Sequence, residues 1–246
     1  MAPAASAVDF QPGEAVRRNR ASVSWTVPED SSGILGFSYL WSRDPGAVPP
    51  QTVMALETQT RAAFDADADG DWYFSIRAQD YAGNWSAASR IQFVRDTTPP
   101  GSPVHLPPPA SRDGFLASNS FALEWSPPPE PDVAGYTWIL EYLGPLDRPP
   151  ARRRPAAIPA VEAGAAIEAP GPNAYELLPA TGYELSLWEQ RPPTAPAPAI
   201  RTARPRAEFS NIDDGYWSFS AAAIDRVGNV GPAARMILRA DKFIPY

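Results

Sequence analysis

Residues 69–86 read DGDWYFSIRAQDYAGNWS, and residues 214–231 read DGYWSFSAAAIDRVGNVG. The two stretches share aromatic, small and turn-forming residues at a constant offset of 145 positions. A strand–turn–strand segment that recurs with its turn residues in place predicts two copies of one small β domain. The shared pairs are Gly70/Gly215, Trp72/Trp217, Phe74/Phe219, Ala78/Ala223, Asp80/Asp225, Gly83/Gly228 and Asn84/Asn229.

Apolar and polar side chains alternate along the first half of the earlier stretch, which is typical of a strand with one buried face. The predicted core face consists of Trp72, Phe74, Ile76 and Ala78, and the predicted wetter face of Tyr73, Ser75, Arg77 and Gln79. The second half of the stretch is a predicted hairpin turn, because Gly and Asn tolerate positive φ and Asp accepts backbone hydrogen bonds.

The repeat extends upstream of these stretches. Trp25 matches Trp125, and Gly36 matches Gly135, at an offset of 99–100 positions. Because the later halves are offset by 145, about 46 extra residues lie inside the second copy. The sequence therefore predicts a long Pro/Arg-rich insertion over about 143–206.

The stretch DTTPPGSP, which begins at Asp96, separates the two copies, and its prolines keep it extended and stiff. We predict a first domain over 1–96, a Pro-rich linker over 97–103 and a second domain over 104–246. The 31 prolines of the chain disfavour long helices, so the expected class is all-β, with two tandem β-sandwiches.

Composition excludes several classes of function. The chain has no cysteine, so thiol catalysis, cysteine-ligated zinc and disulfides are ruled out. A net charge of −7 argues against a nucleic-acid partner. The sequence shows no apolar run long enough for a membrane span and no signal peptide at its start, MAPAASAVDF.

The Trp25-x-x-Pro motif, the Trp72-x-Phe-x-Ile-x-Ala strand and the D-G-x-W-x-F-x-x-x-A-x-D-x-x-G-N pattern together resemble bacterial fibronectin type III-like repeats. The resemblance covers about residues 10–96 and 104–241, apart from the insertion. It implies that each copy is a seven-stranded immunoglobulin-like sandwich. It also implies that Trp72 and Trp217 serve the core, and that the protein is a bacterial periplasmic, cell-surface or secreted one.

An acidic stretch precedes the repeated strand and resembles a calcium loop. Alternating carboxylates followed by glycine can converge on a hard cation. However, Ile76 stands where an EF-hand carries its bidentate glutamate, and the second copy lacks two of the carboxylates. Two interpretations stay open, a calcium site, which would be the only cofactor, or a solvated acidic turn. The candidate ligands are Asp65, Asp67, Asp69 and Asp71.

Catalytic candidates are few. Asp80 and Asp225 lie in equivalent turns of separate predicted domains, so they are expected to cap turns and not to converge. His105 is the single histidine and lies in the Pro-rich linker region, without a second histidine for a triad or a zinc site. The sequence therefore predicts a protein that is not an enzyme.

Binding candidates come from positions where the two copies differ. Tyr81 and Trp85 lie in or after the first turn and are expected to be exposed, as is Tyr73. The insertion adds Trp188 and the basic triplet Arg152, Arg153 and Arg154. Exposed aromatic rings can anchor a protein or stack on a sugar, and proline-rich segments are ready-made ligands.

The main functional hypothesis is a structural or protein-interaction module of a bacterial cell-envelope or secreted protein, acting as a spacer and partner-binding scaffold. The alternatives are a carbohydrate-binding accessory module and an accessory domain of a glycan-active enzyme. A protein partner in the envelope is expected, and a glycan partner is the second choice.

Overall fold

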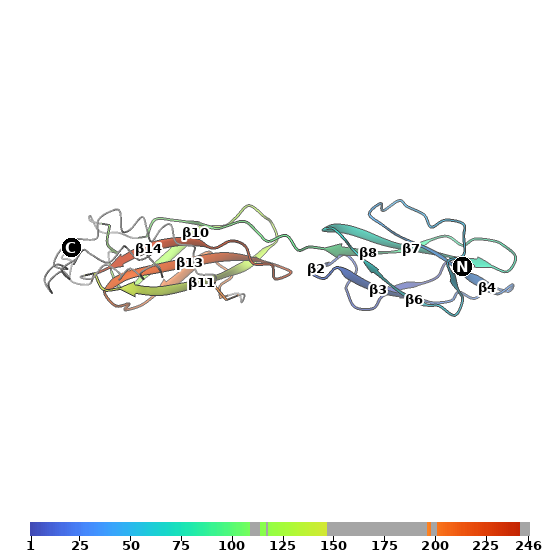
Figure 1. The fold of residues 1–246 in the computed structure, drawn as a ribbon, viewed down its shortest axis with the longest axis horizontal. Coiled ribbons are helices and arrows are strands. Elements are labelled where there is room, and N and C mark those ends of the chain that lie inside the picture. The colour runs from blue at the N-terminus through green and yellow to red at the C-terminus, as the bar shows by residue number, and fades with distance from the viewer. Residues whose placement is uncertain (109–113, 117, 147–195, 198–200, 242–246) are drawn as a thin grey trace, which may run out of the picture. The chain divides into compact units, whose positions relative to one another are not determined.

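The structure is a computed structural model that describes residues 1–108, 114–116, 118–146, 196–197 and 201–241 (Figure 1). The chain divides into two compact units. Unit 1 is Met1–Thr98 with Val227–Asn229, and unit 2 is Pro99–Arg226 with Val230–Tyr246. All regular elements of the described residues are strands, so the expected all-β class is confirmed. Among these residues, no helix could cross a membrane.

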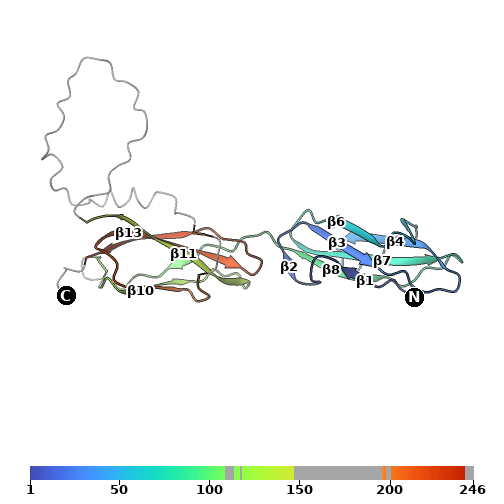
Figure 2. The same cartoon turned by 90° about the horizontal axis from the view of Figure 1, so that it is seen from below.

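Unit 1 contains two sheets. The smaller has the strand order β1-β3-β6, and the larger has the order β2-β8-β7-β4-β5. Only β2 and β8 pair in parallel, and all other neighbours are antiparallel. The strands are β1 (Ala5–Ala7), β2 (Ala15–Val16), β3 (Arg20–Trp25), β4 (Ile34–Ser42), β5 (Ala55–Leu56), β6 (Arg61–Asp65), β7 (Gly70–Asp80) and β8 (Ser89–Arg95) (Figure 2).

The core of unit 1 lies between these sheets, as a sandwich requires. Val23 and Trp25 from β3 pack with Phe37 from β4 and Phe74 from β7. The Trp25 and Phe74 rings are stacked with their centroids 5.7 Å apart. The predicted core face of β7 is confirmed, because Trp72, Phe74, Ile76 and Ala78 are all buried.

The described part of unit 2 contains two three-stranded sheets, with orders β12-β10-β9 and β11-β13-β14. Neighbouring strands in both sheets are antiparallel. The strands are β9 (Val104–His105), β10 (Phe121–Ser126), β11 (Val133–Gly144), β12 (Arg206–Phe209), β13 (Gly215–Asp225) and β14 (Ala234–Ala240).

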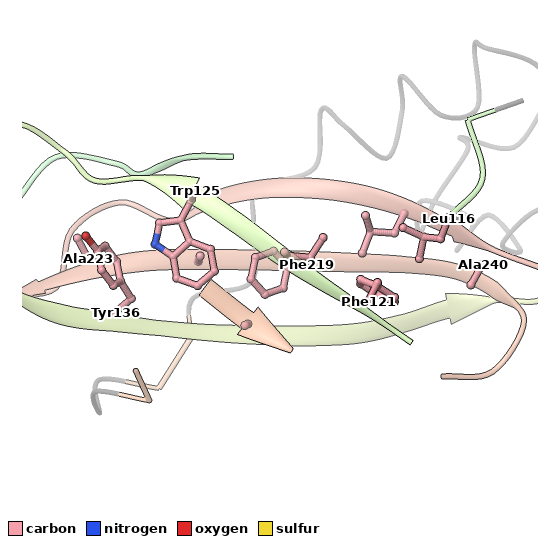
Figure 3. Close-up of a cluster of buried hydrophobic side chains, with 11 residues drawn as sticks. Leu116, Phe121, Trp125, Tyr136, Phe219, Ala223 and Ala240 are labelled. Carbon is pink, nitrogen blue, oxygen red and sulfur yellow. The ribbon is translucent and has the colours of Figure 1, made fainter. Parts of the chain in front are cut away.

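The core of unit 2 gathers around Phe219, which has no exposed surface (Figure 3). Trp125 lies 5.8 Å from it on the opposite sheet, and Phe209 lies 5.8 Å away on β12, both measured between ring centroids. Phe121 and Tyr136 are further buried aromatic residues of this cluster, and Trp138 and Trp217 pack against it. Each unit is therefore two sheets around an aromatic core, although the relation of the units as copies of one domain stays a prediction.

The indole N–H groups of Trp25 and Trp125 are buried and have no hydrogen-bond partner among the described residues. Each indole meets a neighbouring ring edge-on, Trp125 against Tyr136 at 74° and Trp25 against Phe37 at 70°. Figure 3 shows the Trp125 nitrogen turned towards Tyr136.

The wetter face predicted for β7 is wrong at its centre, where Ser75 is buried. The connection between β4 and β5 folds back over this face, and Ser38 donates a hydrogen bond to the Pro50 carbonyl at 2.6 Å. Arg90 bridges the Ser75 hydroxyl at 3.0 Å and the Ala47 carbonyl at 3.2 Å. In unit 2, Thr137 donates in a similar way to the Ala197 carbonyl at 2.6 Å.

Unit 1 contains eight strands where the resemblance implies seven. The two-residue strands β2 and β5 form the two edges of the larger sheet. The predicted insertion falls mostly outside the described residues, and the predicted domain boundaries stay predictions.

Candidate functional site

The repeated Asp-x-x-Gly-Asn motif forms a closed turn in unit 1. The Asp80 carboxylate accepts a bond from the Asn84 backbone N–H at 2.8 Å and from its side-chain amide at 2.9 Å. Gly83 has φ of 89°, a conformation that glycine adopts without strain. The bonds from Asn84 hold the pKa of Asp80 below its ordinary value. The turn-capping role predicted for Asp80 is confirmed, and the carboxylate is committed to the turn.

His105 lies on strand β9, so its sequence-based placement in a linker is wrong. Its Nε2 donates to the Ala234 carbonyl at 2.9 Å, and its ring centroid lies 5.3 Å from that of Phe219. The Nδ1 atom is buried and has no hydrogen-bond partner among the described residues. Burial lowers the pKa of His105, and the bond to Ala234 opposes this only in part. The single histidine therefore packs against the core of unit 2 through the ring of Phe219.

This environment predicts an acid-sensitive unit 2. Because burial disfavours the imidazolium, the unfolded state binds more protons once the pH falls below the ordinary His105 pKa of 6.5. Stability is fully present above that pH and is lost below it, by up to about 1.4 kcal/mol per pH unit. We expect His105→Gln to flatten this slope between pH 6.5 and 5 in urea unfolding. An unchanged slope in His105→Gln would contradict the prediction.

The four candidate calcium ligands have different surroundings. Asp65 lies 3.6 Å from the Arg20 guanidinium, and both side chains are largely exposed. Asp71 accepts a hydrogen bond from the Gln92 amide at 3.1 Å, and Asp67 is exposed. These contacts are typical of a solvated acidic turn, and calcium binding by the four carboxylates stays a prediction.

Asp69, the third of the candidate ligands, binds residues assigned by sequence to the linker. Its carboxylate accepts hydrogen bonds from the Thr97 backbone N–H at 2.9 Å and the Thr98 hydroxyl at 2.8 Å. Arg95 lies 3.6 Å away. Burial by itself raises the pKa of Asp69, but the bonds from Thr97 and Thr98 and the Arg95 charge outweigh it and lower the pKa. Asp69 thus attaches the chain after β8 to unit 1.

Asp69→Asn keeps the shape of this side chain but removes its charge and one acceptor oxygen. We expect unit 1 to lose about 1 kcal/mol of unfolding free energy, since hydrogen bonds to charged groups are among the stronger ones. Hydrogen exchange of the Thr97 and Thr98 amides should quicken. Asp67→Asn, at an exposed carboxylate, is the matched control. Calcium titration of the unmodified chain tests the metal interpretation, because a carboxylate turn without a site gives no saturable heat.

The predicted binding aromatics of unit 1 differ in exposure. Tyr81 is 65% exposed and rests on Gly33, to whose carbonyl its backbone N–H donates at 3.1 Å. Trp85 is half-buried, because the Arg77 guanidinium lies 4.8 Å from its ring centroid. Tyr73 is also half-buried. The other predicted binding residues, Trp188 and Arg152–Arg154, lie outside the described residues.

Sequence reasoning missed two aliphatic side chains on this part of unit 1. Met54 is 51% exposed and Leu56 is 63% exposed. Leu56 lies on edge strand β5 opposite Gly36, and the Met54 N–H donates to the Phe37 carbonyl at 2.8 Å. Since Tyr81 contacts Gly33, directly before β4, all three exposed residues adjoin residues 33–37. We call Met54, Leu56 and Tyr81 the β5 surface.

The sequence has no pattern that marks this surface. Strand β5 is only two residues long, which is too short for an alternation of apolar and polar side chains to be recognised.

No family model and no curated protein matches the chain. A solved structure of Clostridium thermocellum CbhA fibronectin(III)-like modules is similar to it, with 10% sequence identity and a TM-score of 0.39. That similarity covers 99% of this chain and 98% of the other. A TM-score this low supports no argument, so the all-β sandwich assignment stands on the strand registers and cores described above.

Proposed function

We propose that the chain is a non-enzymatic structural and protein-interaction module of a bacterial cell-envelope or secreted protein. In this role it acts as a spacer and binds its partner through the β5 surface. The observation that carries the proposal is the joint exposure of Met54, Leu56 and Tyr81 beside β4. The bacterial and extracytoplasmic setting comes from the resemblance of the repeated motif to fibronectin type III-like repeats.

A protein partner suits this surface better than a sugar does. Met and Leu side chains contribute apolar contact area at protein interfaces, and tyrosine is a frequent anchor there. Sugar binding by stacking needs open aromatic faces, and Arg77 already lies over the Trp85 ring. The carbohydrate-binding alternative therefore depends mainly on Tyr81 within the described part of unit 1.

Two of the three groups considered for catalysis, Asp80 and His105, make contacts that stabilise the fold. Asp80 closes its own turn, and His105 is packed against the core of unit 2. Both groups are thus engaged in contacts of the fold, Asp80 with Asn84 and His105 with the Ala234 carbonyl. These contacts support a non-enzymatic role.

Site-specific photo-crosslinking in the native envelope tests the proposal. A photoreactive residue at Leu56 should yield a discrete protein adduct, and Tyr81→Ala should reduce that adduct. Val104, which is 65% exposed in unit 2, is the matched control position and should give no such band. Equal adducts at both positions, or none at Leu56, would refute the surface assignment. Specific retention on a glycan array that is lost in Tyr81→Ala would favour the carbohydrate-binding alternative.

A further inference from the structure

We propose that strand β6 of unit 1 pairs edge to edge, in antiparallel fashion, with β6 of a second copy of this chain. The inference is independent of the partner surface proposed above, because β6 belongs to the other sheet of unit 1. It rests on the free edge of β6, on the order of charges along it, and on a contrast with strand β12 of unit 2.

Strand β6 is the outermost strand of the sheet β1-β3-β6 (Figure 2). The Ala66 N–H donates to the Asn19 carbonyl at 2.7 Å, and the Trp25 N–H donates to the Thr60 carbonyl at 3.0 Å. These two bonds show which residues of β6 are hydrogen-bonded to β3, because only alternate residues of an antiparallel strand bond to a given neighbouring strand.

In this alternation, the backbone N–H and C=O groups of Ala62 and Phe64 point towards β3. Those of Arg61, Ala63 and Asp65 face the open edge. The Asp65 carbonyl accepts a bond from the Trp41 indole at 3.1 Å, and a carbonyl oxygen can accept a second hydrogen bond. An exposed row of backbone donors and acceptors is a template for pairing with another strand.

The residues of β6 read Arg-Ala-Ala-Phe-Asp, which is self-complementary in antiparallel pairing. If the two-fold axis passes through Ala63, Arg61 of each copy faces Asp65 of the other. Opposite charges at facing positions stabilise an antiparallel pair, and the small Ala63 avoids a clash at the axis. The side chains of Arg61, Ala63 and Asp65 are all exposed, as this pairing requires.

Strand β12 carries a related sequence, Arg-Ala-Glu-Phe, at the offset of the repeated motif. Glu208 stands where β6 has Ala63, so the same symmetric pairing would bring two carboxylates together at the axis. Like charges at facing positions are destabilising. Charged side chains are a usual protection of edge strands, and β6 lacks one at its centre.

Five residues per strand make a small interface, so the association should be weak and visible only as the protein concentration rises. Sedimentation of the full chain over a concentration series should show a monomer–dimer equilibrium. Ala63→Glu, which copies β12, should weaken it by about tenfold or more. Gln51→Glu adds the same charge at another exposed site of unit 1 and should leave the equilibrium unchanged. A chain that stays monomeric throughout, or an Ala63→Glu variant that dimerises like the parent, overturns the proposal.

Complementary charge variants provide a sharper test. Arg61→Asp and Asp65→Arg should each weaken self-association by about tenfold, because both place like charges opposite each other. An equimolar mixture restores opposite charges in the heterodimer, so dimer should return. If the mixture stays as monomeric as the single variants, the proposed register is wrong.

Disulfide trapping locates the axis, since the chain has no cysteine of its own. Facing residues of a hydrogen-bonded antiparallel pair have Cα atoms about 5.5 Å apart, within the range that a disulfide spans. Ala63→Cys should therefore form covalent dimers under mild oxidation, and Glu208→Cys should not. Equal trapping at both positions would contradict the proposal. Failure of this test leaves the photo-crosslink at Leu56 unaffected, so the two proposals fail separately.

Discussion

Phe219→Ala is expected to lower the unfolding free energy of unit 2 by about 3–5 kcal/mol, the usual cost of removing a buried aromatic ring. Phe219 has no exposed surface and contacts rings from four other strands, namely His105, Trp125 and Phe209 on the opposite sheet and Trp138 on the neighbouring strand β11. Since these rings come from both sheets, the cavity cannot close by the movement of one side chain. A loss of this size is a large part of the stability of an ordinary domain.

Hydrogen exchange measures the loss of stability separately in unit 1 and unit 2. Peptides from β13 should lose protection in Phe219→Ala, while peptides from β7 should keep it. Phe74→Ala is the matched variant in unit 1, because Phe74 is equally buried and packs against Trp25 and Phe64. Phe74→Ala should reduce the protection of peptides from β7 and leave that of peptides from β13 unchanged. Full protection of β13 in Phe219→Ala would show that the ring is not the centre of that core.

Gly36→Ala is expected to destabilise unit 1 by about 1–3 kcal/mol, as overpacked sites usually do. A Cβ at Gly36 would collide with the Ala55 carbonyl and would lie 2.6 Å from Val53 Cγ1. The Ala55 carbonyl belongs to backbone, so the clash is relieved only if β5 moves away from β4. This displaces Leu56, which pairs with Gly36, and with it the β5 surface.

Two measurements check this prediction. The thermal unfolding temperature of unit 1 should fall, and the Met54 amide, which donates to the Phe37 carbonyl, should exchange its hydrogen faster. Gly46→Ala is the control, since a Cβ there meets only the side-chain carboxylate of Asp44, at 3.3 Å. The Leu56 photo-crosslink should weaken in Gly36→Ala and persist in Gly46→Ala. Unchanged stability and exchange in Gly36→Ala would mean that β5 accommodates the methyl group in place.

The local features of this protein followed from its sequence. The alternation from Trp72 to Ala78 predicts which side of β7 is buried, because a strand turns successive side chains to opposite faces. The Asp80–Asn84 turn was equally predictable, since its hydrogen bonds join residues four positions apart. The all-β class followed from the same patterns together with the 31 prolines.

Other features depend on residues that are distant in the sequence. Ser75 is buried because the chain between β4 and β5 crosses over it, and no pattern within β7 predicts this burial. Asp69 reads as part of an acidic stretch, yet it binds Thr97 and Thr98, 28 and 29 positions away. His105 was assigned to a linker from the sequence, yet it pairs with Trp125 on β10 and its ring contacts that of Phe219 on β13.

The sequence by itself therefore determined the longer strands, their core faces and the Asp80–Asn84 turn, because these depend on neighbours within a few residues. The tertiary structure alone decided which polar residues are buried, that the exposed residues Met54, Leu56 and Tyr81 all adjoin residues 33–37, and that β6 is an edge. The physical reason is that exposure and strand edges depend on which distant segment packs alongside, and a single sequence carries no periodic signal of that packing.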